Sequence, residues 1–183
     1  MCVTVSEGFV TSISADSDRC DAGRITEVLV DLAGVTGCDT RVGVLRDDCV
    51  FYWEAPPGLS FAGPSLSAGS VAAHLTASGQ LLLAAGGAVH EVIDRKWPSA
   101  GPVAKQEREA LVKALMVIRL SGVAITRTRR PGGTLGVAVP VRGADNRVAA
   151  ALELDAYDFG QVESVLVELR AASRRLSEPA TRH

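Results

Sequence analysis

The chain carries few of the side-chain combinations that catalysis or metal binding requires. Its three histidines, His74, His90 and His183, form no HExxH or HxH motif, and its four cysteines form no CxxC pair. A structural zinc site is therefore not indicated, and the cysteines are expected to be free thiols. The GxSxG elbow, the P-loop, GxGxxG and SxxK are all missing from the sequence. We expect no enzymatic activity, no metal and no cofactor.

Two carboxylates and one histidine remain as candidates for acid–base chemistry. Glu153, Asp155 and His74 could serve a small enzyme only if they shared a cleft and lay within hydrogen-bonding reach of one another. His74 together with an acidic residue could also form a loose metal site. The alternation of the segment Val148–Leu154 places Glu153 on one strand face with Ala151. That face is turned either to a pocket or to solvent.

Composition narrows the class of protein that has to position these residues. The 183 residues are 47% hydrophobic and carry a net formal charge of −2, which predicts one folded domain and not a disordered chain. The isoelectric point of about 5.9 is far below that of a free-standing nucleic-acid-binding domain. The longest apolar run, Leu81–Val89, spans nine residues, whereas a transmembrane helix needs about 20. Because the N-terminus has no secretory signal, we expect a cytoplasmic protein without a membrane partner.

Hydrophobic spacing predicts both helices and hairpin strands. Leu111, Leu115 and Ile118 make the apolar stripe of the clearest helix. Hydroxyl residues before an apolar run predict the start of a short buried helix near Ser78, and Asp158 predicts the capped start of the last helix. The predicted elements are a helix over 23–37, strands over 40–46 and 49–55, a Pro/Gly/Ser-rich loop over 56–70, a short strand over 71–75, the short helix, an irregular segment over 86–104, a helix over 105–121, strands over 123–128, 135–141 and 148–154, and a final helix.

The order of these elements predicts the fold class. Strands that come in hairpins, and do not alternate with helices, are typical of α+β proteins. The expected architecture is a central antiparallel sheet with helices on one face and, on the other, a ligand pocket under loops and the short helix. Such an arrangement is typical of sensor domains. Within the sheet, Pro140 indicates an edge or a bulge, because proline cannot donate to a strand ladder.

Two blocks of the sequence follow a pattern known from one family. The block His74–Ala84 reads HLTASGQLLLA, close to H-A-T-A-S-G-K-A-L-L-A, and the block Ile118–Leu154 is close to I-R-x2-G-[YW]-A, acidic residues, a glycine, A-x-P-V, a turn and V-x-A-A-L-x-[VL]. Together they resemble the effector-binding domain of IclR-type transcriptional regulators (the isocitrate-lyase-regulator family). The matching positions of the second block are Ile118, Arg119, Gly122, Ala124, Gly133, Ala138, Pro140, Val141, Val148, Ala150, Ala151 and Leu152.

The resemblance implies a GAF-like fold with a pocket for a small metabolite, often one that bears a carboxylate. In this sequence, the start of a helix at Ala77, Ser78 and Gly79 would present unpaired backbone N–H groups and the positive end of the helix dipole, which suit an anion. Small residues there would let a ligand approach the backbone. Alternatively, Ser78 only caps the helix, and the two roles are compatible.

The sequence also departs from the family pattern at the expected pocket. Thr126 stands where an acidic residue is common, and Glu153 and Asp155 stand where small hydroxyl residues are frequent. If both carboxylates point inward, they would repel a carboxylate ligand and favour a cation or a hydroxyl-rich molecule; otherwise they form a solvated strand end. The segment Thr128–Arg130 is either a solvated turn or a basic lip. By position, the ligand-binding candidates are Val71, Ala77, Ser78, Gly79, Thr126, Thr134, Gly136, Glu153 and Asp155.

The predicted organisation is an N-terminal arm over 1–21, an effector-binding domain over 22–178 and a disordered tail over 179–183. The arm has no recognisable winged helix-turn-helix, so DNA is a partner only through an absent or separate DNA-binding domain. The predicted function is effector binding in a homodimeric or homotetrameric transcription regulator whose oligomer rearranges when the small molecule binds. The alternative is a stand-alone sensor or dimerisation module with a vestigial pocket, filled by side chains such as Phe51, Tyr52 or Trp53, without direct DNA binding.

Overall fold

A computed structural model of the chain describes residues 22–54, 65–66, 70–86, 102–128 and 133–178. The predicted arm over 1–21, most of the loop over 56–70, the segment 87–101, the turn over 129–132 and the tail over 179–183 lie outside the described residues.

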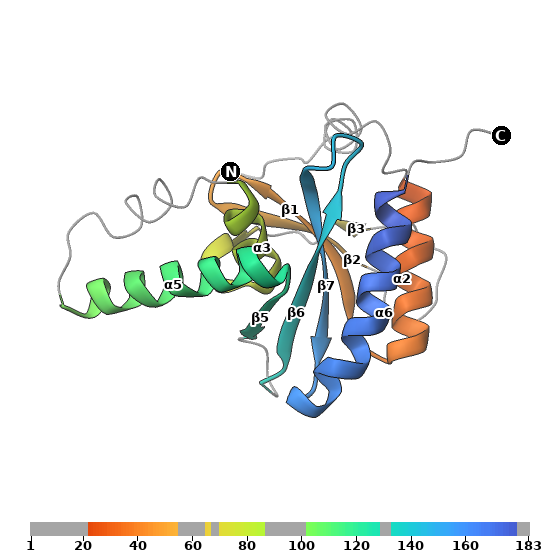
Figure 1. Ribbon diagram of the computed structural model, residues 1–183. Coiled ribbons are helices and arrows are strands. Elements are labelled where there is room, and N and C mark those ends of the chain that lie inside the picture. Colours follow the sequence, from red (N-terminus) through yellow and green to blue (C-terminus); the bar gives the residue numbers. More distant parts are fainter. Residues whose placement is uncertain (1–21, 55–64, 67–69, 87–101, 129–132, 179–183) are drawn as a thin grey trace.

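One antiparallel sheet organises the domain (Figure 1). The strands follow the order β3-β2-β1-β7-β6-β5 across the sheet, and β4 also pairs with β2. Every described pair is antiparallel, which confirms the α+β prediction. The strands are β1 (Thr40–Arg46), β2 (Cys49–Glu54), β3 (Ser65–Leu66), β4 (Val71–Ala72), β5 (Ala124–Arg127), β6 (Leu135–Arg142) and β7 (Val148–Ala156).

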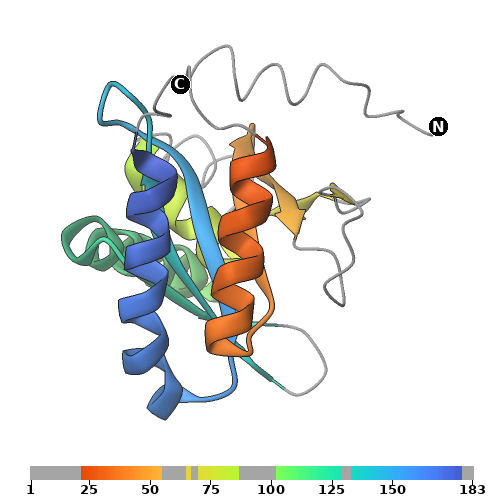
Figure 2. The ribbon, with the colours of Figure 1, turned by 90° about the vertical axis from the view of Figure 1, so that its right-hand side faces the viewer.

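Two helices cover one face of the sheet. Helices α2 (Ala22–Thr36) and α6 (Phe159–Ser177) lie side by side on it (Figure 2). The apolar stripe of α2 is buried against this face and consists of Ile25, Val28, Leu29 and Leu32. As predicted, Asp158 caps α6, because its Oδ1 accepts a hydrogen bond of 2.9 Å from the backbone N–H of Gln161. The strand residues in this core are Val42, Trp53, Leu135, Val137, Val139, Val141, Ala150, Leu152, Leu154 and Ala156.

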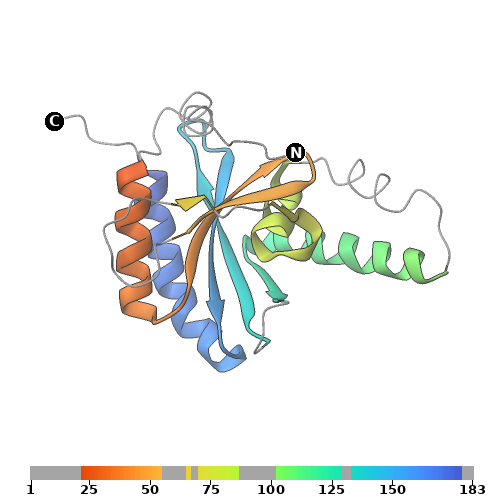
Figure 3. The ribbon, with the colours of Figure 1, turned by 180° about the vertical axis from the view of Figure 1, so that it is seen from behind.

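The opposite face of the sheet is covered by the 3-10 helix η1 (Ala73–Leu75) and α3 (Ala77–Gly86), and α5 (Pro102–Ser121) lies next to α3. We call this face of the sheet the α3 face. Helix α5 packs against α3 and runs on past the sheet (Figures 1 and 3). The stripe predicted for the clearest helix is buried here, together with apolar residues of α3. This second core lies between the sheet and α3, where the pocket was expected.

Several predicted boundaries are corrected by the structure. Helix α3 begins at Ala77, and the residue that caps it is Thr76, whose Oγ1 accepts a hydrogen bond of 3.0 Å from the Gly79 amide. The alternative that Ser78 caps the helix is therefore wrong, because Ser78 already belongs to the first turn. The helix predicted over 105–121 begins at Pro102, since proline fits the first helical position. The predicted strand over 71–75 is a two-residue strand followed by η1, and the loop over 56–70 includes β3.

Pro140 lies inside β6 at a place where it does not interrupt the sheet. The pairing of β5 with β6 ends at Ala138, so Pro140 has no β5 neighbour that needs its missing N–H group. A register shift follows between Val141 and Arg142. Both features agree with the edge-or-bulge expectation.

The first turn of α3 approaches η1 so closely that no side chain fits at Gly79. A Cβ there would lie 2.1 Å from the backbone oxygen of Ala73. We expect Gly79→Ala to lower the free energy of unfolding by about 3 kcal/mol or more, because backbone atoms cannot give way as a flexible side chain does. The control is Gly34→Ala in α2, where a Cβ would meet nothing within 4 Å. This control should be neutral or stabilise the fold by up to about 1 kcal/mol. Urea denaturation measures both, and equal effects would contradict the close packing.

Candidate functional site

A buried group of charged side chains lies on the α3 face, beneath the first turn of α3. Arg41 of β1 and Glu153 of β7 are direct neighbours across the two strands, and Asp155 shares their face because it follows two residues later. The exposed fractions of Arg41, Glu153 and Asp155 are 6%, 1% and 5%. The alternative that the two carboxylates form a solvated strand end is therefore wrong. We call Arg41, Tyr52, Ser78, Glu153 and Asp155 the carboxylate cluster.

Arg41 holds both carboxylates of the cluster. Its Nη1 and Nη2 donate to Oδ2 and Oδ1 of Asp155 at 2.9 and 2.6 Å, which is the bidentate geometry that guanidinium groups favour. Nη2 also donates to Oε1 of Glu153 at 2.5 Å. Burial by itself would lower the pKa of Arg41, but the charges of Glu153 and Asp155 outweigh burial and raise that pKa. Arg41 is therefore a permanent cation between two acids.

The second oxygen of Glu153 faces the start of α3. Its Oε2 accepts a hydrogen bond of 2.8 Å from the backbone N–H of Ser78 and one of 3.2 Å from the hydroxyl of Tyr52. A negative charge is stabilised at this end of a helix by the unpaired N–H groups and the dipole. The helix N-terminus that the sequence predicted for an anion thus holds a carboxylate of the chain itself.

Missing side chains at two glycines allow these groups to meet. Gly136 of β6 lies opposite Asp155, and a Cβ there would come within 2.9 Å of Oε1 of Glu153. At Gly43 of β1, a Cβ would lie 3.0 Å from the Cβ of Ser78. Gly136, a predicted ligand-binding position, therefore makes room for Glu153, and Gly43, which was not predicted, makes room for α3.

The structure brings most of the predicted site residues together. Thr134 is engaged elsewhere, because its Oγ1 lies 2.7 Å from Oγ1 of Thr128. Val71 is 38% exposed on β4 and lies outside the carboxylate cluster. Gly79 adjoins the cluster, although its amide is used by the Thr76 cap. The predicted residues that meet around Glu153 and Gly136 are Ala77, Ser78, Thr126, Gly136, Glu153 and Asp155.

The sequence analysis missed Arg41, and it named Tyr52 only as a side chain that could fill a vestigial pocket. A signal for Arg41 was present, because Val42 alternates with it and takes the helix-covered face of β1. Inward carboxylates also need a counter-charge, which we expected from a ligand and which the chain supplies. No signal in the sequence indicated that the Tyr52 hydroxyl bonds to Glu153.

The described part of the chain contains neither a candidate metal site nor a membrane-spanning helix. No group of three His, Cys, Asp or Glu residues there could hold a metal ion. No helix among the described residues is both long enough and apolar enough to cross a membrane.

The sequence matches the family described as bacterial transcriptional regulator IclR, C-terminal, over residues 24–178. The chain belongs to this family. The predicted resemblance is thereby confirmed, and the domain is an IclR-type effector-binding domain. Its family is one of transcriptional regulators and is not an enzyme class. None of the curated proteins matches this sequence.

Solved IclR-type structures share the fold of this chain. An IclR homolog from Microbacterium sp. is 21% identical with a TM-score of 0.71, over 96% of this chain and 72% of that one. An IclR homolog from Microbacterium hydrocarbonoxydans, solved with 4-hydroxybenzoate, is 24% identical with a TM-score of 0.65, over 86% and 68%. A double mutant of the PobR inducer-binding domain from Acinetobacter, solved with 3-hydroxybenzoic acid, is 18% identical with a TM-score of 0.64, over 87% and 98%.

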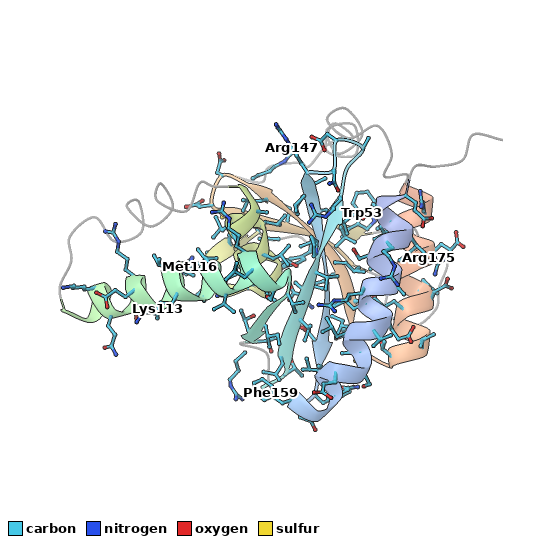
Figure 4. The ribbon with its side chains drawn as sticks, viewed as in Figure 1. Trp53, Lys113, Met116, Arg147, Phe159 and Arg175 are labelled. Carbon is cyan, nitrogen blue, oxygen red and sulfur yellow. The ribbon has the colours of Figure 1, made fainter. Side chains whose placement is uncertain are left out.

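Arg41 is expected to be essential for the stability of this IclR-type domain. Arg41→Leu leaves two buried carboxylates without their counter-charge, so it should lower the free energy of unfolding by about 3–5 kcal/mol. Arg147→Leu is the control, because Arg147 lies at the β6–β7 turn (Figure 4) and pairs with Asp145 while the two side chains are 88% and 61% exposed. Exposed pairs contribute little. If chemical denaturation gave both variants the same stability, the described role of Arg41 would be wrong.

Tyr52 gives the domain a pH dependence in the alkaline range. Burial, and next the charge of Glu153, raise the pKa of the Tyr52 hydroxyl above its ordinary value of about 10. Because the folded state favours the neutral hydroxyl, this stabilisation is complete below about pH 10 and is lost as the pH rises further. Tyr52→Phe should therefore lose less stability than the wild type above about pH 10.

The same prediction can be read from tyrosine absorbance. Tyr157→Phe leaves Tyr52 as the one tyrosine of the chain, so the ultraviolet signal of tyrosinate then reports Tyr52 alone. We expect this signal only above the ordinary range, at a pH where the fold also begins to open. Ionisation of the folded protein at about pH 10 would contradict the environment described for Tyr52.

Proposed function

We propose that the chain binds a small-molecule effector at the carboxylate cluster and controls transcription through a ligand-dependent change in the geometry of a homodimer or homotetramer. The observation that carries this proposal is the burial of Arg41, Glu153 and Asp155 between the sheet and α3. A buried ion pair seldom stabilises a fold more than apolar residues of the same size. Ligand recognition explains why charged residues are buried at this place, whereas stability of the fold alone does not.

Ser78 supports a ligand with hydrogen-bonding groups at this place. Its side chain is fully buried, and its hydroxyl has no hydrogen-bond partner among the described residues. Such unsatisfied groups are rare in folded proteins. A bound hydroxylated molecule would supply the missing hydrogen bond to the Ser78 hydroxyl. Thr126 places a second hydroxyl group on the same face. Two structural neighbours were solved with hydroxybenzoates, which are small molecules that carry a hydroxyl group. They support a small hydroxylated effector.

The wider role follows from the family. We infer that DNA is reached through a separate DNA-binding part, that the protein acts in the cytoplasm, and that residues 22–178 form the sensing unit. The proposed site does not include Val71, Gly79 and Thr134, which lie around it. Ligand binding regulates such an assembly when one oligomer geometry binds the effector better than the other.

A second candidate function is a sensor or dimerisation module with a vestigial pocket. It is favoured by Tyr52, which is buried on the α3 face, and by the Ser78 amide, which is already bonded to Glu153. Of the other two aromatic residues considered, Phe51 and Trp53 belong to the core under α2 and α6. In this case no small molecule would bind at the cluster.

An acid–base enzyme is the weakest reading. Glu153 and Asp155 are buried and near each other, as that reading required, but Arg41 pairs with both. The oxygens of Glu153 are engaged by Arg41, Tyr52 and Ser78. A carboxylate with these partners is held as an ion-pair partner and is not placed to exchange a proton with a substrate.

Effector binding is tested by thermal unfolding of the 183-residue chain with a panel of neutral hydroxylated, cationic and carboxylate metabolites. A compound that binds the folded state stabilises it by RT ln(1 + [L]/Kd), about 2.7 kcal/mol at a hundredfold excess over Kd. We expect at least one compound to raise the melting temperature and to change the oligomer seen by light scattering.

Two variants locate the binding site. Thr126→Val removes a hydroxyl from the α3 face and should weaken binding, whereas Ser164→Ala, on the exposed side of α6, should leave it unchanged. If no compound shifts the melting temperature, the vestigial module becomes the better account. A monomer that stays monomeric with a bound ligand would remove the oligomer mechanism and leave only the binding.

A further inference from the structure

The carboxylate of Glu153 occupies the position on the α3 face that best suits an effector anion. It lies at the N-terminal end of α3, a helix of ten residues, and accepts the Ser78 N–H bond at 2.8 Å. Its other oxygen is 2.5 Å from the guanidinium of Arg41. A backbone N–H at a helix start together with an arginine is a combination that binds free carboxylates. Here both donors serve a side chain of the same protein.

We propose that Glu153 is a built-in carboxylate that determines the effector specificity of this domain by excluding small carboxylates from the start of α3. The inference rests on the proposed function and deepens it, since it names a class of effector that the site rejects. The end of an effector that reaches this place is then a hydroxyl or another neutral group.

The backbone amides of Ser78, Gly79 and Gln80 are already in use. The amide of Ser78 bonds to Glu153 and the amide of Gly79 bonds to Oγ1 of Thr76. The amide of Gln80 bonds to the backbone oxygen of Thr76 at 3.0 Å. An incoming carboxylate would therefore have to break an existing bond to reach one of these amides, because none of the three is free.

The room for a carboxylate is also taken. At Gly136 a Cβ would lie 2.9 Å from Oε1 of Glu153 and 3.5 Å from the Cβ of Ala77. The space that glycine leaves above β6 is thus filled by the Glu153 carboxylate. This observation is independent of the hydrogen bonds, and it shows that the packing of β6 and α3 is shaped around this carboxylate.

The charges of the cluster add to the exclusion. Arg41 carries one positive charge against the two negative charges of Glu153 and Asp155, and Asp155 holds it through two hydrogen bonds. A further carboxylate would meet an excess of negative charge in a site of low dielectric constant. Without Glu153, the Arg41–Asp155 pair would be neutral and the Ser78 amide would be free.

The variant Glu153→Ala tests whether a free carboxylate binds at the start of α3 once the Glu153 carboxylate is removed. The substitution deletes one methylene group and the carboxylate, which are the atoms of acetate. We expect the variant to melt below the wild type and acetate to raise its melting temperature in proportion to the logarithm of acetate concentration. Acetate should leave the wild type unchanged, and sodium chloride and acetamide should not replace acetate in the variant.

Two further variants separate charge, volume and general destabilisation. Glu163→Ala removes an exposed glutamate of α6 and should show no acetate response. Glu153→Gln keeps the volume and removes the charge, so it should be less stable than the wild type and should not respond to acetate, because the space stays filled. A folded Glu153→Ala protein without an acetate response would overturn the proposal.

A measurement on the wild type keeps the test independent of how well the variant folds. The amide resonance of Ser78 should stay in place when acetate, a carboxylate without a hydroxyl group, is titrated into the 183-residue chain. A saturable shift of this resonance would show that free carboxylates reach the start of α3, and the proposal would be wrong. If instead no metabolite of any class binds the wild type, the proposed effector function fails while the acetate result still decides the role of Glu153.

Discussion

The ion-paired carboxylate of Glu153 is the interaction on which the α3 half of the domain depends. It joins three elements, because Arg41 comes from β1, Glu153 from β7 and the Ser78 amide from α3. A carboxylate in an apolar core is costly unless its charge and its lone pairs are satisfied. The Ser78 amide and the glycine at 136 both serve this requirement, while apolar residues of α3 pack on the same face of the sheet. An effector that changes one of these bonds therefore acts on the contact between α3 and the sheet.

The fold could be predicted from the sequence because its signals are local. The apolar stripes of α2 and α5, the Asp158 cap and the hairpin of β1 with β2 each depend on residues close together in the chain. The start of α3 was placed one residue late, since Thr76 and Ser78 carry the same capping signal and only the chain geometry distinguishes them. The extent of β7 to Ala156 was also missed, because strand ends depend on the neighbouring strand.

Most residues of the site were predicted, but the ion pairs and hydrogen bonds between them were not. Ser78, Gly136, Glu153 and Asp155 were all expected near a pocket, and they do meet. The partner of Glu153 was not found, because Arg41 lies 112 residues away in sequence and the pairing of β1 with β7 is set by the strand order of the whole sheet. A small residue beside the start of a helix is also compatible with two arrangements. It provides room for the carboxylate of a ligand or for one from the protein, and only the strand register decides between them.

The tether of Glu153 to its strand explains why the built-in carboxylate prevails over free ones. A free acid that binds the Ser78 amide loses translational and rotational freedom, at an estimated cost of about 4–15 kcal/mol. Glu153 has already lost that freedom in folding, and its orientation is fixed by Arg41 and Tyr52. A free carboxylate that makes the same bonds would therefore bind more weakly than the side chain it must displace, even without repulsion. Discrimination at this site thus follows from the covalent attachment, and the charge excess of the cluster only increases it.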